Sequence, residues 1–79
     1  MSRKVYVRVL AETDEEGNTM PVSVSWKDGR SYNIDKVTDI RRAYATKVGG
    51  TAIRYTVRIS GKETYIFKEN AKWFVESKV

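Results

Sequence analysis

Apolar and polar residues alternate with a period of two through most of this chain. Over residues 54–60 every second side chain is apolar, which is typical of a half-buried strand. A second run rich in β-branched and aromatic residues follows at residues 64–67. Because Gly61 suits the first central position of a type II′ turn, the pattern predicts a hairpin with the two-residue loop Gly61-Lys62.

The same alternation predicts three more strands outside this hairpin. They span about residues 4–11, 21–26 and 72–77. Pro21 is expected at the start of its strand, where a missing amide hydrogen is harmless. The three-residue loop Lys27-Asp28-Gly29 then leads into a further strand, and a left-handed Gly29 places Val24 opposite Tyr32.

The segment 35–47 fits two patterns. Its apolar residues at helical spacing include Val37, Ile40 and Tyr44. The segment also alternates as a strand does, and Gly49-Gly50 then forms the turn of a hairpin. We choose the strand, because residues 54–60 need an antiparallel neighbour.

Together these elements give six or seven short antiparallel strands with a turn about every eight to twelve residues. We predict one all-β domain spanning residues 1–79, a small antiparallel meander that forms an SH3-like barrel or a strongly curved sheet. A short helix over residues 37–46 is the alternative for the ambiguous segment. The candidate core residues are Trp26, Tyr32, Tyr44, Tyr55, Ile59 and Trp73.

Composition removes most catalytic and metal-binding chemistry. Cysteine and histidine are both absent from the 79 residues, which excludes the usual zinc ligands and the commonest general base. We expect no enzyme activity, no catalytic residues, no cofactor and no metal. Asp14, Glu16 and Asn18 alternate as calcium ligands do, but glycine falls at the fourth loop position and Ser25 at the twelfth. A solvated hairpin tip is therefore the better interpretation.

The sequence also carries expectations about location and assembly. No apolar run approaches the length of a membrane span, and the basic N-terminal segment lacks the small-residue cleavage site of a signal peptide. We therefore expect a cytoplasmic protein without membrane contact, present as a monomer or a weak homodimer.

Several segments together resemble a family of short uncharacterised bacterial proteins. The segments are W-x-D-G-R-x-Y-x-I-D at 26–35, the glycine pair at 49–50, R-Y-T-V-R-I-x-G-K-E-T-Y at 54–65 and W-F-V-E at 73–76. The resemblance covers most of the chain beyond Met20. It implies a single small β domain and a bacterial origin, and it assigns no functional residues.

The basic residues are unevenly distributed along the chain, whose net charge is +5. Residues 40–62 carry no acid, whereas four of the ten acidic residues lie within residues 12–16. The basic residues of this acid-free segment are Arg41, Arg42, Lys47, Arg54, Arg58 and Lys62. The net charge favours anionic partners.

Strand register predicts which of these residues share a face of the sheet. Two-residue turns at Gly49-Gly50 and Gly61-Lys62 place Arg41 opposite Arg58, and Arg58 opposite Tyr65. One face then carries Arg41, Arg54, Arg58, Tyr65 and Phe67, and the other carries Tyr44, Tyr55, Val57, Ile59 and Ile66. Arg42 falls on the second, buried face, so either it reaches solvent at an edge or the strand interpretation of its segment is wrong.

The first face predicts a function. Sheet surfaces bind single strands by stacking bases on aromatic rings while arginines hold phosphates. We therefore predict a binding module for single-stranded nucleic acid, with Arg41, Arg54, Arg58, Tyr65 and Phe67 as its contact residues. The alternative is a protein-interaction module or adaptor that uses the same face, or an exposed edge strand, against an acidic partner. A purely structural interpretation also stays open, in which Tyr65 and Phe67 pack under a loop or under the terminal strand.

Overall fold

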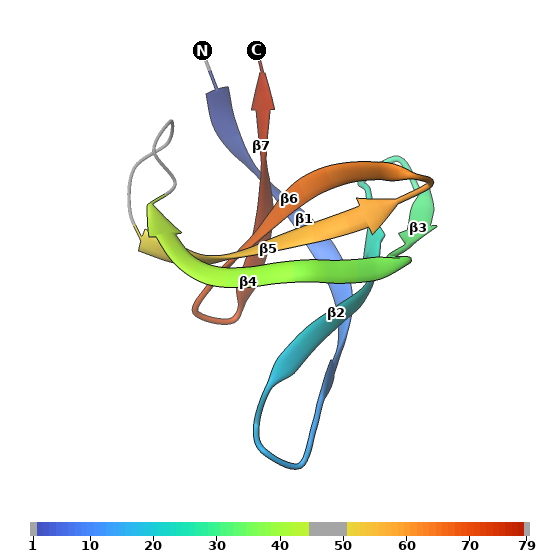
Figure 1. Ribbon diagram of the computed structural model, residues 1–79. Coiled ribbons are helices and arrows are strands. Elements are labelled where there is room, and N and C mark those ends of the chain that lie inside the picture. The colour runs from blue at the N-terminus through green and yellow to red at the C-terminus, as the bar shows by residue number, and fades with distance from the viewer. Residues whose placement is uncertain (1, 45–50, 79) are drawn as a thin grey trace.

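The computed structural model describes residues 2–44 and 51–78, and all of its regular elements are strands (Figure 1). They are β1 (Ser2–Thr13), β2 (Thr19–Ser25), β3 (Ser31–Asn33), β4 (Lys36–Tyr44), β5 (Thr51–Ile59), β6 (Lys62–Glu69) and β7 (Lys72–Lys78). Every pairing is antiparallel. The all-β prediction is confirmed, and the ambiguous segment is a strand as far as Tyr44, while residues 45–47 lie outside the described part.

The strands form one sheet in the order β3-β2-β1-β7-β6-β5-β4. Two meanders, β1–β3 and β4–β7, meet where β1 pairs with β7. The first half of β1 pairs with β7, and its second half, from Arg8 to Thr13, pairs with β2. Figure 1 shows the β1–β2 hairpin leaving the layer of β4, β5 and β6 at a steep angle, so that the sheet curls into a half-barrel.

Two irregularities in the ladders accompany this curl. In β2, Val22 is the extra residue between the pairs Leu10–Ser23 and Ala11–Pro21. Pro21 therefore lies at a bulge inside β2 rather than at the start of the strand, and a bulge is another position that tolerates its missing donor. In β4, Thr38 is the extra residue between Val37 and Asp39, and its hydroxyl donates to the Thr56 carbonyl at 3.3 Å.

The main core fills the inner face of the curl. Its buried residues are Val24, Tyr55, Val57, Ile66 and Trp73, and partly buried side chains such as Tyr32 and Ile59 pack against them. The rings of Tyr55 and Trp73 lie 5.1 Å apart. Burying side chains of this size contributes roughly 2–3 kcal/mol each, so this cluster is the principal source of stability.

Four of the six predicted core residues therefore lie in or against the core. Trp26 is the exception, because its side chain is half-buried and belongs to neither buried cluster. The side chain of Tyr44 lies outside the described part of the structure.

The β2–β3 hairpin has the predicted loop. Trp26 N–H donates to the Arg30 carbonyl at 2.8 Å, and the loop residue Gly29 has φ +93°. Val24 lies opposite Tyr32. A three-residue loop of this kind needs a left-handed residue at its last position, and glycine adopts that conformation readily. Gly29 therefore sets the end of the loop and with it the register of the hairpin.

The β5–β6 turn differs from the prediction by one position. The loop is Ser60-Gly61 rather than Gly61-Lys62, and its residues have φ of 51° and 78°. Two successive positive φ values are typical of a type I′ turn. Ser60 is held there by its N–H, which donates to Asp35 Oδ2 at 3.1 Å. The predicted Arg58–Tyr65 pair is therefore wrong, because Arg58 lies opposite Glu63 and Tyr65 lies opposite Thr56.

The β4–β5 register also differs from the prediction. Arg41 lies opposite Arg54, not opposite Arg58, and the pair nearest the turn is Tyr44–Thr51. The predicted Gly49-Gly50 turn itself falls outside the described residues. Both registers are displaced by an even number of residues, so Arg41, Arg54, Arg58, Tyr65 and Phe67 stay on their predicted face.

Arg42 reaches solvent as the strand interpretation requires. It lies opposite Ile53 on the inner face, where both side chains are exposed. This end of β4 and β5 extends past the main core, so the arginine needs no buried partner.

The acidic segment forms the tip of the β1–β2 hairpin. The Asp14 carboxylate accepts hydrogen bonds from the N–H groups of Glu16 and Asn18 at 2.9 and 2.8 Å. The hydrogen bond from the Asn18 backbone is the main reason that the pKa of Asp14 lies below its usual value. Within residues 2–44 and 51–78 there is no cluster of three or more acidic side chains that could hold a metal ion, and no helix long and apolar enough to cross a membrane.

Candidate nucleic-acid interface

The face of the sheet opposite the main core carries a row of directly paired residues across five strands. The row runs Arg41, Arg54, Phe67, Phe74 and Tyr6, from β4 through β5, β6 and β7 to β1. We call the face that carries this row the basic-aromatic face. All five sequence-predicted site residues lie on it, although their neighbours differ from those predicted.

Arg54 and Tyr65 form the best-defined contact among the predicted site residues. The guanidinium carbon of Arg54 lies 4.5 Å from the centroid of the Tyr65 ring, within the range of a cation–π interaction. The Tyr65 side chain is 47% exposed. Arg54 Nε is buried and has no hydrogen-bond partner among the described residues. The pair therefore combines an exposed aromatic ring with a partly buried guanidinium that lies over it.

Arg41 is held by a neighbouring acid. Its Nε donates to Asp39 Oδ2 at 2.6 Å, along the same strand and on the same face. This hydrogen bond holds the pKa of Asp39 below its usual value and raises the pKa of Arg41. The charge of Arg41 is therefore partly compensated, and its side chain is 61% exposed.

Arg58 lies at a distance from the other two arginines. It is exposed, and its directly opposite neighbours are Glu63 on β6 and Lys36 on β4. The structure thus brings Arg41, Arg54 and Tyr65 together, and it places Arg58 four residues further along β5.

Phe67 is not available as a stacking surface. Its side chain is 3% exposed and stacks on the fully buried Phe74 at 5.2 Å, with an interplanar angle of 8°. These two rings and Ala52 form a second small core on the basic-aromatic face. Phe67 therefore supports the face from beneath, and Tyr65 is the exposed one of the two predicted aromatic residues.

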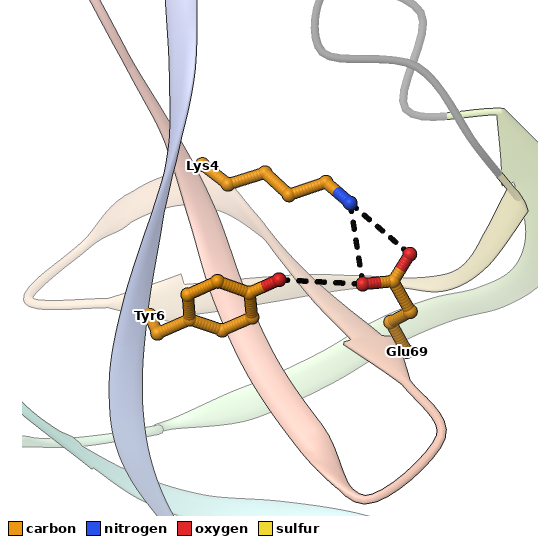
Figure 2. A network of polar contacts seen from close by, with 3 residues as sticks. All are labelled: Lys4, Tyr6 and Glu69. Carbon is orange, nitrogen blue, oxygen red and sulfur yellow. Dashed lines mark hydrogen bonds and ion pairs between the residues drawn. The ribbon is translucent and has the colours of Figure 1, made fainter.

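Tyr6 is a surface aromatic that the sequence pattern did not single out. Its side chain is 43% exposed and its ring packs edge-on against Phe74 at 5.9 Å. Figure 2 shows the Tyr6 hydroxyl and the Lys4 ammonium converging on Glu69. Lys4 Nζ donates to both Glu69 oxygens at 3.2 and 3.1 Å, and the Tyr6 hydroxyl donates to Oε1 at 3.4 Å. The Tyr6 hydroxyl thus contacts the Lys4–Glu69 ion pair at the end of the row.

A groove of about 440 Å³ adjoins Tyr6 at the start of the β2–β3 turn. Its lining residues are Tyr6, Val7, Arg8, Ser25, Trp26, Lys27, Gly29 and Ser31. We call this the Trp26 groove. The sequence signal for it was the position of Trp26 at the very end of its strand, beside Lys27, where the neighbouring strands no longer cover a side chain.

The fold and this face define a class of protein: a small antiparallel half-barrel with one apolar inner face and one basic-aromatic face. Comparisons with protein-family models, curated proteins and solved structures found no match to this chain. The resemblance to a bacterial family and the SH3-like topology therefore stay predictions, and function has to be argued from the surface itself.

Proposed function

We propose that this protein is a small binding module for single-stranded nucleic acid, and that it binds through Arg41, Arg54, Arg58 and Tyr65. The observation that carries the proposal is the Arg54–Tyr65 stack at 4.5 Å, with Arg41 directly opposite Arg54. Two like charges directly opposite each other destabilise a sheet. Asp39 offsets part of that cost at Arg41, and a phosphate bound between the two arginines offsets the rest.

The stack also suits a base. Nucleic-acid bases stack on tyrosine rings and on the planes of arginine guanidinium groups. Arg54 covers part of the Tyr65 ring, so a base stacks either on the outer plane of the guanidinium or on the exposed part of the ring. Such contacts are tolerant of sequence, because every base has a π face.

The proposal is tested by titrating a labelled oligothymidylate of about 12 nucleotides, a length within the usual site size, at several salt concentrations. Replacing Arg54 and Arg58 with Gln is expected to weaken binding. The slope of log affinity against log salt is expected to fall by about 0.7 for each phosphate that the variant no longer neutralises. Tyr65→Ala is expected to cost about 1–3 kcal/mol of binding free energy.

The matched control removes the same charge from the opposite face. Arg42 on β4 and Lys62 on β6 belong to the strands that flank β5, which carries Arg54 and Arg58. Both are exposed and lie on the inner side of the sheet. Arg42→Gln with Lys62→Gln is expected to leave the salt slope unchanged. Equal weakening by both pairs means that the affinity is generic attraction to a basic protein, and no binding at about 50 mM salt refutes the function.

A different observation favours a second candidate function, a protein-interaction module. In the described sheet β4 is an edge strand of nine residues, paired with β5 on one side. Beside it lies a groove of about 510 Å³ whose lining includes the exposed Met20, Ile40 and Ile53. An extended acidic segment of a partner adds to such an edge by strand pairing. This function is favoured if the oligonucleotide does not bind while an acidic peptide binds the wild type and not Ile40→Asp.

A further inference from the structure

The Trp26 groove combines features that the proposed function leaves unused. Two aromatic side chains border it, the half-buried Trp26 and the 43% exposed Tyr6. Two exposed cations, Arg8 and Lys27, lie among its lining residues, and none of the lining residues is acidic. This combination of rings and cations is the one that single-strand binding surfaces use.

The charge of the groove is not neutralised from nearby. Within the described residues, neither Arg8 nor Lys27 forms an ion pair. Asp28, which follows Lys27 in the sequence, pairs instead with Arg30 at 3.1 Å. A third cation, Lys72, lies 5.5 Å from the Tyr6 ring centroid and lines the adjoining groove on the far side of Tyr6 and Arg8. The positive charges of Arg8 and Lys27 are therefore not compensated by an ion pair, whereas the charge of Arg41 is compensated by Asp39.

Polar groups in the groove are available as well. Ser25 and Ser31 hold each other through their hydroxyl oxygens at 2.9 Å, directly across the β2–β3 ladder. A hydroxyl can donate one hydrogen bond and accept others. The pair can therefore bind a phosphate or a base edge between Arg8 and Lys27.

Geometry connects the groove to the Arg54–Tyr65 stack. Both border the basic-aromatic face, and the row of paired residues from Arg54 through Phe67 and Phe74 to Tyr6 joins them. Three strand spacings of about 4.8 Å give about 14 Å between the ends of this row. At about 3.4 Å per stacked nucleotide, that distance is about four nucleotides.

From these observations we infer that the Trp26 groove is a second binding site for the same single strand, with a base against Trp26 or Tyr6 and phosphates on Arg8 and Lys27. The inference rests on the proposed function and extends it. The favoured ligand is then a strand of several nucleotides that crosses the face, and not an isolated phosphate or mononucleotide.

The test combines charge removal with a local optical signal. Arg8→Gln with Lys27→Gln is expected to lower the salt slope for the 12-nucleotide oligothymidylate by up to about 1.4, because two phosphates are no longer neutralised. Combined with the Arg54 and Arg58 substitutions, the decrease is expected to reach about 2.8. Trp26→Ala is expected to weaken binding roughly 5- to 150-fold, the effect of removing one ring on which a base stacks.

Tryptophan fluorescence separates direct binding from a general effect of charge. Trp73 is 9% exposed and also lines the adjoining groove beside Lys72, so comparison with a Trp26 variant is needed to assign the quenching to Trp26. We expect quenching in the wild type and none in Trp26→Phe, which keeps an aromatic ring for binding. Circular dichroism of each variant excludes unfolding as the cause.

The outcomes distinguish the inference from the proposed function. If the Arg8 and Lys27 variant binds as the wild type does and Trp26 is not quenched, while the Arg54 and Arg58 variant is weakened, the inference is wrong and the proposed function stands. If the Arg8 and Lys27 variant alone is weakened, the Arg54–Tyr65 site is wrong and the groove is the whole binding site. If no variant differs from the Arg42 and Lys62 control, both are wrong.

Discussion

The surroundings of the two tryptophans differ although the sequence pattern assigned both to the core. Trp73 lies in the middle of paired strands, between Lys68 on β6 and Val7 on β1, and is buried. Trp26 lies one residue past the end of β2, at the closing pair of a hairpin loop, and lines a groove. Alternation thus assigns a side chain to a face, while the extent of the neighbouring strands decides whether that face is covered.

The largest expected effect is on stability, and it separates the two tryptophans directly. Trp73→Ala removes a ring from the core and is expected to destabilise the protein by about 3–5 kcal/mol. Trp26→Ala is expected to cost about 1 kcal/mol, the typical effect of a single substitution, because Trp26 is half-buried and outside both core clusters. Chemical denaturation of both variants measures the difference. Equal destabilisation contradicts the assignment of Trp26 to a groove.

Tyr55, which packs against Trp73, provides a smaller and pH-dependent test of the core. Its hydroxyl donates to the Thr19 carbonyl at 3.0 Å. Tyr55→Phe leaves that carbonyl without its donor, so a loss of about 0.5–1.5 kcal/mol is expected at neutral pH. Denaturation of the wild type and of Tyr55→Phe measures it, and identical stability shows that the hydrogen bond contributes nothing.

Burial raises the pKa of Tyr55 above its ordinary value of 10.0. The folded state therefore holds the proton to higher pH than the unfolded state, and stability falls as pH rises above about 10. Tyr55→Phe lacks this titration. The stability difference between the two proteins is expected to shrink as pH rises through the raised pKa, and a constant difference across that range contradicts the burial of an ionisable hydroxyl.

Much of the fold follows from the sequence because it depends on local rules. Period-two alternation located the strands, and Gly29 fixed the β2–β3 register, since its left-handed conformation admits few alternatives. Ser60 shows the limit. A serine is a poor choice for positive φ, and its position depends on a hydrogen bond from its N–H to Asp35, a residue 25 positions away that no local rule connects to it.

Part of the candidate site was also predictable from local alternation. Face assignments for Arg41, Arg54, Arg58, Tyr65 and Phe67 survived both register errors, because the errors were even-numbered. The burial of Phe67 agrees with the structural interpretation that the sequence left open, because Phe67 stacks on Phe74 of the terminal strand β7; local pairing rules could not choose between the two interpretations. The absence of acids from residues 40–62 suggested a more positive surface than the structure has. Asp39 and Glu63 lie immediately outside this segment, and they are placed beside Arg41 and Arg58.

The central claim is that one nucleic-acid strand crosses the basic-aromatic face from the Arg54–Tyr65 stack to the Trp26 groove. An NMR titration of the backbone amides and the tryptophan side-chain N–H groups with the 12-nucleotide oligothymidylate tests it most directly. We predict that shifts concentrate around Arg54, Tyr65, Tyr6 and Trp26, and that the acidic hairpin tip from Asp14 to Asn18 is unaffected. Shifts confined to β4 and the groove at Ile40, or spread evenly over all exposed amides, would contradict the account.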